Sequence, residues 1–161
     1  MRKIMIIAAF MLLTVSAFAQ NGKAIYNKYS DADDVSAVYI SPAMFKIIGN
    51  IPNLSIGQDD VNLTPVVRSL TGFYLIDSDN PGVNASLRKD IDKLLDAGKY
   101  ELLMEAKDNG ETMRMYTIGD DAIVTSFIMT VVENDQCTFI ALEGKISRDK
   151  LSEILATAMD E

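Results

Sequence analysis

The segment AIVTSFIMTVVENDQCTFIALEG, residues 122–144, decides the fold of this chain. It contains two apolar runs, Ala122–Val132 and Cys137–Gly144, separated by the polar turn sequence Glu133-Asn134-Asp135-Gln136. Both runs carry apolar side chains on both faces of the expected strands, which is typical of strands at the centre of a covered sheet. The segment therefore predicts two neighbouring strands, joined by a turn, in the middle of a sheet.

Two further strands are expected before this segment, at Tyr100–Lys107 and Thr112–Ile118. The residues between them, Asp108-Asn109-Gly110-Glu111, place Asn-Gly at the centre of the turn, which is the strongest short sequence signal for a β-hairpin. A second turn, Gly119-Asp120-Asp121, leads into the run that begins at Ala122. These strands predict a four-strand meander in the C-terminal half.

Helical patterns lie before and between the strands. Residues 84–97 form the clearest amphipathic helix, because leucine and isoleucine recur at helical spacing on one face, and Gly98 is expected to cap its end. A short helix is expected between Ser41-Pro42 and Gly49, and a last helix after Ser147.

The N-terminal half adds two strands. Val35–Ile40 alternates with period two, and a second strand runs from Leu70 to Asp77, while residues 49–66 have the composition of a loop. The order β-α-β-α-β-β-β-β-α predicts an α+β fold, a largely antiparallel sheet with helices packed against it.

Residues 1–19 have the pattern of a secretory signal peptide. Arg2 and Lys3 form a basic start, residues 4–15 are an almost wholly apolar run, and Ala17-Phe18-Ala19 is a small-x-small cleavage site. The apolar run is too short to span a bilayer as a helix. We therefore expect an exported protein.

Cleavage before Gln20 would leave residues 20–161 as a single α+β domain. A lipoprotein carries cysteine directly after the cleavage site, and Gln20 stands there, so we expect a periplasmic or extracellular protein and not a lipoprotein. The expected signal holds two of the 15 basic residues and none of the 23 acidic ones, so the remaining chain has a net charge of −10.

That charge disfavours nucleic acid and anionic lipid as general partners, because both attract Lys and Arg. No later stretch reaches 18 consecutive apolar residues, so no membrane span is expected.

Several short phrases resemble the bacterial domain-of-unknown-function 4252 family. They are Lys28-Tyr29-Ser30, Val38-Tyr39-Ile40-Ser41, Met44-Phe45, Tyr100-Glu101-Leu102-Leu103-Met104-Glu105, Lys107-Asp108-Asn109-Gly110-Glu111 and Glu143-Gly144-Lys145-Ile146. The resemblance covers nearly all of residues 20–161 and implies a small exported protein of Gram-negative bacteria. It implies no activity and supplies no catalytic residue.

The inventory of reactive side chains is short: there is no histidine, and Cys137 is the single cysteine, expected to be buried and inert.

Asp77–Gly82 begins like a calcium loop but has Pro81 at the fifth place and Arg88 at the twelfth, so a turn into a helix is the better interpretation. Asp31–Asp34 is expected to be a solvated strand entry. We predict no metal ligand, no cofactor and no cofactor-binding residue.

Catalytic residues are not expected either. Glu101 and Glu105 would share one face of a strand about 13 Å apart, too far for glycoside hydrolysis. Ser86 and Lys89 have Ser-x-x-Lys spacing at the expected start of a helix, where a capping serine is the simpler explanation. Ser147 repeats that spacing at another helix start.

Four methionines, Met104, Met113, Met115 and Met129, are compatible with an adaptable binding surface, but filling an irregular core is the interpretation we favour here.

The sequence predicts a non-catalytic exported domain that binds another envelope protein or ligand, with its sheet and residues 49–66 as the contact surface. Two alternatives remain: a small hydrolase using carboxylates or serine with lysine, and a structural protein that self-associates through a strand such as Val35–Ile40. The oligomeric state is open.

Overall fold

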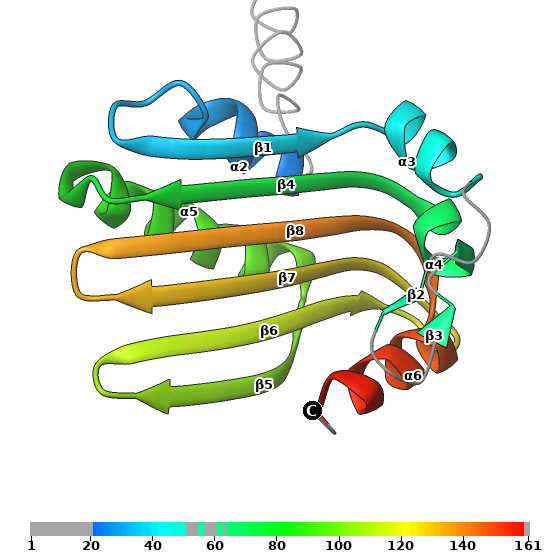
Figure 1. Cartoon of the computed structure of the whole chain (residues 1–161). Coiled ribbons are helices and arrows are strands. Elements are labelled where there is room, and N and C mark those ends of the chain that lie inside the picture. The colour runs from blue at the N-terminus through cyan, green and yellow to red at the C-terminus, as the bar shows by residue number, and fades with distance from the viewer. Residues whose placement is uncertain (1–20, 51–54, 57–60, 63, 160–161) are drawn as a thin grey trace, which may run out of the picture.

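A six-stranded antiparallel sheet forms the centre of the molecule (Figure 1). The computed structural model describes residues 21–50, 55–56, 61–62 and 64–159. The strand order across the sheet is β1-β4-β8-β7-β6-β5. The strands are β1 (Val35–Ile40), β4 (Leu70–Ser78), β5 (Glu101–Asp108), β6 (Glu111–Gly119), β7 (Ile123–Glu133) and β8 (Gln136–Ser147).

Five helices and a small hairpin complete the described chain. The helices are α2 (Gly22–Tyr29), α3 (Pro42–Ile48), α4 (Thr64–Ser69), α5 (Pro81–Gly98) and α6 (Arg148–Met159), and the hairpin pairs β2 (Ser55–Ile56) with β3 (Val61–Asn62). The expected signal peptide, residues 1–19, lies outside the described residues.

The predicted α+β class is confirmed, and β5, β6, β7 and β8 are neighbours in chain order, as a meander requires. Asn109 (φ 46°) and Gly110 (φ 95°) both adopt the left-handed conformation that a tight hairpin turn needs. The whole sheet is not a single meander, because β4 pairs with β8 and β1 is added beyond β4. β7 lies between β6 and β8, and β8 lies between β7 and β4, so both are interior strands, as their two-sided apolar pattern predicted.

Helices α2 and α5 lie together on one face of the sheet, which we call the covered face (Figure 1). Their apolar side chains pack on alternate residues of β4, β7 and β8, including Ile76, Ile128 and Phe139, all with no exposed surface. A second, smaller core lies at one end of the opposite face. There Phe45 of α3 and residues of α4 and α6 pack around Leu70, Val124 and Ile146.

Helix α5 begins earlier than its apolar pattern predicted. Its N-cap is Asn80, whose side chain accepts hydrogen bonds from the amides of Gly82 and Val83, and Pro81 occupies the first turn. The expectation that Ser86 caps this helix is therefore wrong, since Ser86 lies inside it. At the other end, the left-handed cap is Lys99 (φ 53°) and not Gly98.

A buried hydrogen bond and a partly exposed ion pair, both to Asp90, join α2 to α5. The Tyr29 hydroxyl donates to Oδ2 of Asp90 at 2.7 Å, and Nζ of Lys28 donates to the same oxygen at 2.5 Å. Burial opposes ionisation of Asp90, but the two hydrogen bonds outweigh it and hold the pKa of this carboxyl below its usual value. The same burial and hydrogen bond raise the pKa of Tyr29 to about 12.

Candidate functional site

One apolar residue from each of the six strands lies in a single row across the sheet. In the pairing register each residue of the row lies opposite the next one on the neighbouring strand. From β1 to β5 the row is Val38, Leu75, Ile140, Met129, Met115 and Met104. The row lies on the face opposite α2 and α5, because its members alternate along the strands with residues of the covered face. We call it the apolar row.

No described helix covers the apolar row. None of its members belongs to either hydrophobic core, and helices α3, α4 and α6 lie at one end of the sheet, beyond it (Figure 1). Val38 is 45% exposed and Met104 is 38% exposed, and the other four side chains are half-buried by one another. Met113 and Val131 pair in the adjacent row and extend the surface. The apolar row with these two residues is called the open face below.

The open face corrects two sequence-based expectations. The strands β7 and β8 were expected in a sheet covered on both faces, and in the described structure the apolar row has no such cover. The four methionines were expected to fill a core, and instead all four lie on the open face, with Met115 directly opposite both Met104 and Met129. Methionine is flexible and polarisable, which suits a surface that adapts to a partner.

An acidic rim borders the open face. Four connecting segments lie at the same end of the sheet: residues 31–34, 79–80, 108–111 and 133–136. None of them contains Lys or Arg. The acidic residues of these turns are all exposed: Asp31, Asp33, Asp34, Asp79, Asp108, Glu111, Glu133 and Asp135. An apolar surface beside this rim presents both a hydrophobic and an electrostatic contact to a partner.

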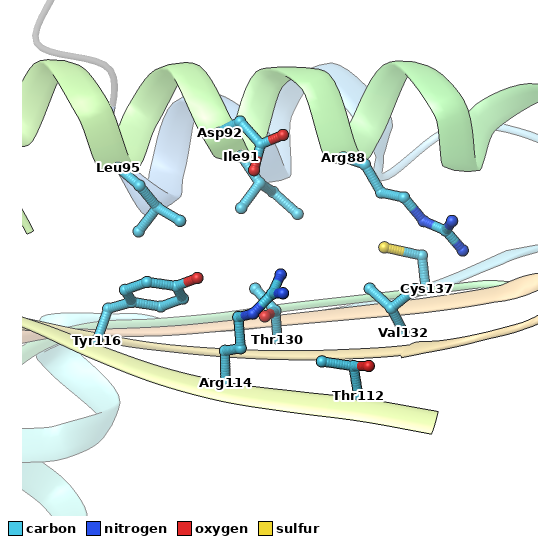
Figure 2. A pocket seen from close by; sticks show the side chains of 10 residues that line it. All are labelled: Arg88, Ile91, Asp92, Leu95, Thr112, Arg114, Tyr116, Thr130, Val132 and Cys137. Carbon is cyan, nitrogen blue, oxygen red and sulfur yellow. The ribbon is translucent and has the colours of Figure 1, made fainter. Parts of the chain in front are cut away.

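The covered face contains a cavity of about 310 Å³ between α5 and the sheet. Arg88 enters it from the helix and Arg114 from β6 (Figure 2). The other lining residues are hydroxyl-bearing, apolar or acidic: Thr112, Tyr116, Thr130, Ile91, Leu95, Val132, Cys137 and Asp92. No motif in the sequence marks either arginine as part of a site.

The acidic loop Asp77–Gly82 begins a helix. Asn80 caps α5 and also donates from its side-chain amide to the carbonyl of Asp33, while Asp77 accepts a 2.7 Å hydrogen bond from the Thr138 hydroxyl. The described residues contain no group of three or more His, Cys, Asp or Glu side chains arranged to hold a metal ion.

Glu101 and Glu105 do not share a face of β5, contrary to the expectation from their spacing. The register shifts between Leu102 and Met104, so Glu101 lies opposite Thr117 and Glu105 opposite Arg114, an odd number of residues apart on β6. Glu105 accepts from Nε of Arg114 at 2.6 Å and pairs with Lys107 at 2.8 Å, so it serves an ion-pair cluster.

Ser86 and Lys89 are both exposed on α5, and neither lines the cavity. Cys137 is a free, fully buried thiol, as expected. Burial raises its pKa, although the neighbouring Arg88 guanidinium acts in the opposite direction.

Fold and surfaces together define a small α+β protein built on one antiparallel sheet, with one face covered by helices and the other partly open. A family model described as "Domain of unknown function (DUF4252)" matches residues 29–154, and the chain belongs to this family. No curated protein and no solved structure matches significantly. Among the described residues, no helix combines the length and apolarity needed to cross a bilayer.

Proposed function

We propose that this protein is an exported, non-catalytic binding domain of the cell envelope, and that its open face holds a partner protein. The apolar row carries the proposal. A row of six apolar side chains that crosses the whole sheet, with two members exposed and four half-buried, is more contiguous than the scattered apolar residues normal on a monomer surface. Covering it with another apolar surface removes that area from water, which is favourable.

The partner's chemistry follows from what borders the open face. The acidic rim runs parallel to the row and favours basic residues, and the row itself carries no charge. The complementary segment is therefore apolar on the face toward the sheet and basic along the side next to the rim. The row crosses six strands at about 4.8 Å spacing, which is about 24 Å and matches a helix of about 16 residues. A cationic amphipathic segment of a protein is therefore the occupant we propose.

Two observations support a binding role over a hydrolytic one. Ser86 and Lys89 are exposed on α5 away from the cavity, and Glu101 and Glu105 point to opposite faces of β5. Neither pair offers the shared geometry that nucleophilic or acid–base chemistry needs.

Export is tested by the N-terminus of the protein recovered from a secreting Gram-negative host. We expect an intact mass that begins at Gln20, without lipid. An intact mass that corresponds to residues 1–161, or to a lipid-modified chain, contradicts this part of the proposal.

Partner binding is tested with a synthetic helix of about 16 residues made of leucine and lysine. We expect it to bind the wild-type chain, and the double variant Met115→Lys/Met129→Lys to bind at least about tenfold more weakly, because two cations on the row repel the peptide and interrupt its apolar contact. Met44→Lys/Ile47→Lys is the matched control, since it also adds two positive charges and its two residues are 46% and 65% exposed on α3, outside the open face. Equal binding by both variants would refute the proposed face, and so would equal binding of a leucine–glutamate peptide.

A second candidate is self-association through β1. This strand pairs with β4 on one side only, has no charged residue, and exposes Val38 and Tyr39 by 45% and 43%. Sedimentation velocity at micromolar concentration separates the two functions. A monomer that binds the peptide supports the partner proposal, and a stable dimer that no longer binds it supports self-association.

A further inference from the structure

The cavity beneath α5 has a feature that the fold alone does not explain. The Nε of Arg88 is buried and has no hydrogen-bond partner. A terminal nitrogen of the same guanidinium donates to the carbonyls of Asn134 and Gln136, both at a long 3.4 Å. Buried donors are almost always paired, so an acceptor group in this cavity would satisfy the Nε of Arg88.

Arg114, the other arginine of the cavity, is held by a hydrogen bond from its Nε, while its terminal nitrogens face the cavity. Nε of Arg114 donates to Glu105 at 2.6 Å, and the second carboxylate oxygen of Glu105 pairs with Lys107. This clamp fixes the guanidinium plane through one edge. In Figure 2 the terminal nitrogens of Arg114 point up from the sheet toward the helix, into the space between the two layers.

Arg88 and Arg114 differ from the other arginines of the described chain in lining a cavity. Four arginines follow residue 20, and Arg68 and Arg148 each donate from Nε to a loop carbonyl at 2.6 Å, at Gly49 and Asp120. Arg88 and Arg114 instead both line one cavity in a protein of net negative charge. Two guanidinium groups with neighbouring hydroxyls form a set of donors that suits a carboxylate or phosphate.

The rest of the lining is apolar. Ile91 and Leu95 project from α5 toward the sheet, and Val132 lies on the opposite wall (Figure 2). At about 30 Å³ for each water-sized group, the cavity has room for roughly ten such groups. Asp92, the acidic lining residue, is exposed and carries the opposite charge to the two arginines.

We infer that this cavity is a binding site for a small organic anion with a short apolar tail, its charged head between Arg88 and Arg114 and its tail against Ile91 and Leu95. The site is separate from the open face, because α5 and the open face lie on opposite sides of the sheet. The inference does not depend on the proposed partner binding.

Calorimetric titration of protein expressed from the full chain tests the inference with four probes. Hexanoate has head and tail, acetate and inorganic phosphate have only an anionic head, and hexanol has only the tail. We expect hexanoate to bind at least about tenfold more tightly than each of the others, because only it makes both contacts. Tightest binding by phosphate or hexanol, or no binding of hexanoate up to millimolar concentration, would overturn the inference.

Arg88→Gln and Arg114→Gln each remove one guanidinium, and we expect each to weaken hexanoate binding by about tenfold to a hundredfold. Lys89→Gln is the matched control, because it makes the same charge change at an exposed position next to Arg88 on α5. Equal weakening by the control would show that net charge, and not the cavity, attracts the anion. The melting temperature of each variant shows whether it folds, and the two arginine variants lie on different elements, so either one suffices for the test.

Discussion

Met115 on β6 lies directly opposite Met129 on β7, in the middle of an apolar row to which all six strands contribute. Neither side chain belongs to a hydrophobic core of the described structure. The two methionines therefore lie in strands whose sequences predict a core position, but they pack in neither core of the described structure. This relationship is the basis of the proposed function.

Ile128 and Met129 are adjacent on β7 and point to opposite faces, so truncating each one measures how well its face is covered. Ile128 has no exposed surface, and we expect Ile128→Ala to lower the free energy of unfolding by about 2–5 kcal/mol. Met129→Ala should cost less than about 1 kcal/mol, because its side chain is only half-buried and belongs to neither hydrophobic core. Denaturant unfolding gives both values, and equal losses would mean that the open face is covered.

The contact between α2 and α5 depends on Tyr29. We expect Tyr29→Phe to lower the free energy of unfolding by about 1–2 kcal/mol, because it removes a buried hydrogen bond to the ionised Asp90. Lys28→Ala removes the other donor to the same oxygen and should cost less, since the Lys28 side chain is 60% exposed. A larger loss for Lys28→Ala than for Tyr29→Phe would show that the ion pair dominates this contact.

Two buried tyrosines predict an alkaline limit to stability. Burial, together with hydrogen bonding to Asp90 for Tyr29 and the charge of Glu143 for Tyr74, raises the pKa of both to about 12. In the unfolded chain they ionise near pH 10, so their contribution to stability is complete below pH 10 and is lost as the pH rises from about 10 to about 12. Unfolding followed by circular dichroism across this range should show the decline, and Tyr29→Phe should make it shallower. A flat profile would contradict the raised pKa values.

Cys137 should react slowly with thiol reagents in the native protein. It is fully buried with a raised pKa, although it lines one wall of the cavity. Labelling then requires local opening, and we expect a rate about a hundredfold or more below that in denaturant. Native labelling at the denatured rate would show that the cavity admits the reagent.

Much of the fold could be predicted from local patterns. The β5–β6 hairpin follows from Asn109-Gly110, and the interior position of β7 and β8 follows from their two-sided apolar composition. Both signals depend only on residues close together in the chain. The pairing of β4 with β8 joins segments 59 to 74 residues apart, from Ser78 with Cys137 to Leu70 with Gly144, and no local pattern encodes it.

The site was harder to predict than the fold. Alternation along β7 shows that Met129 and Ile128 face opposite ways, but not which face a helix will cover. The register shift at Leu103, which separates Glu101 from Glu105 and aligns Met104 with Met115, is likewise invisible in the sequence. For the cavity, the available signal was an arginine inside an otherwise largely apolar strand, at position 114.

The most direct test of the open face uses protein labelled with ¹³C at the methionine methyl groups, titrated with the leucine–lysine helix and followed by NMR. The methyl signals of Met104, Met113, Met115 and Met129 should shift together and saturate, while that of Met44, on α3, stays unchanged. Shifts confined to Met44, or no shift in the four methionines of the open face at saturating peptide, would contradict the proposed function.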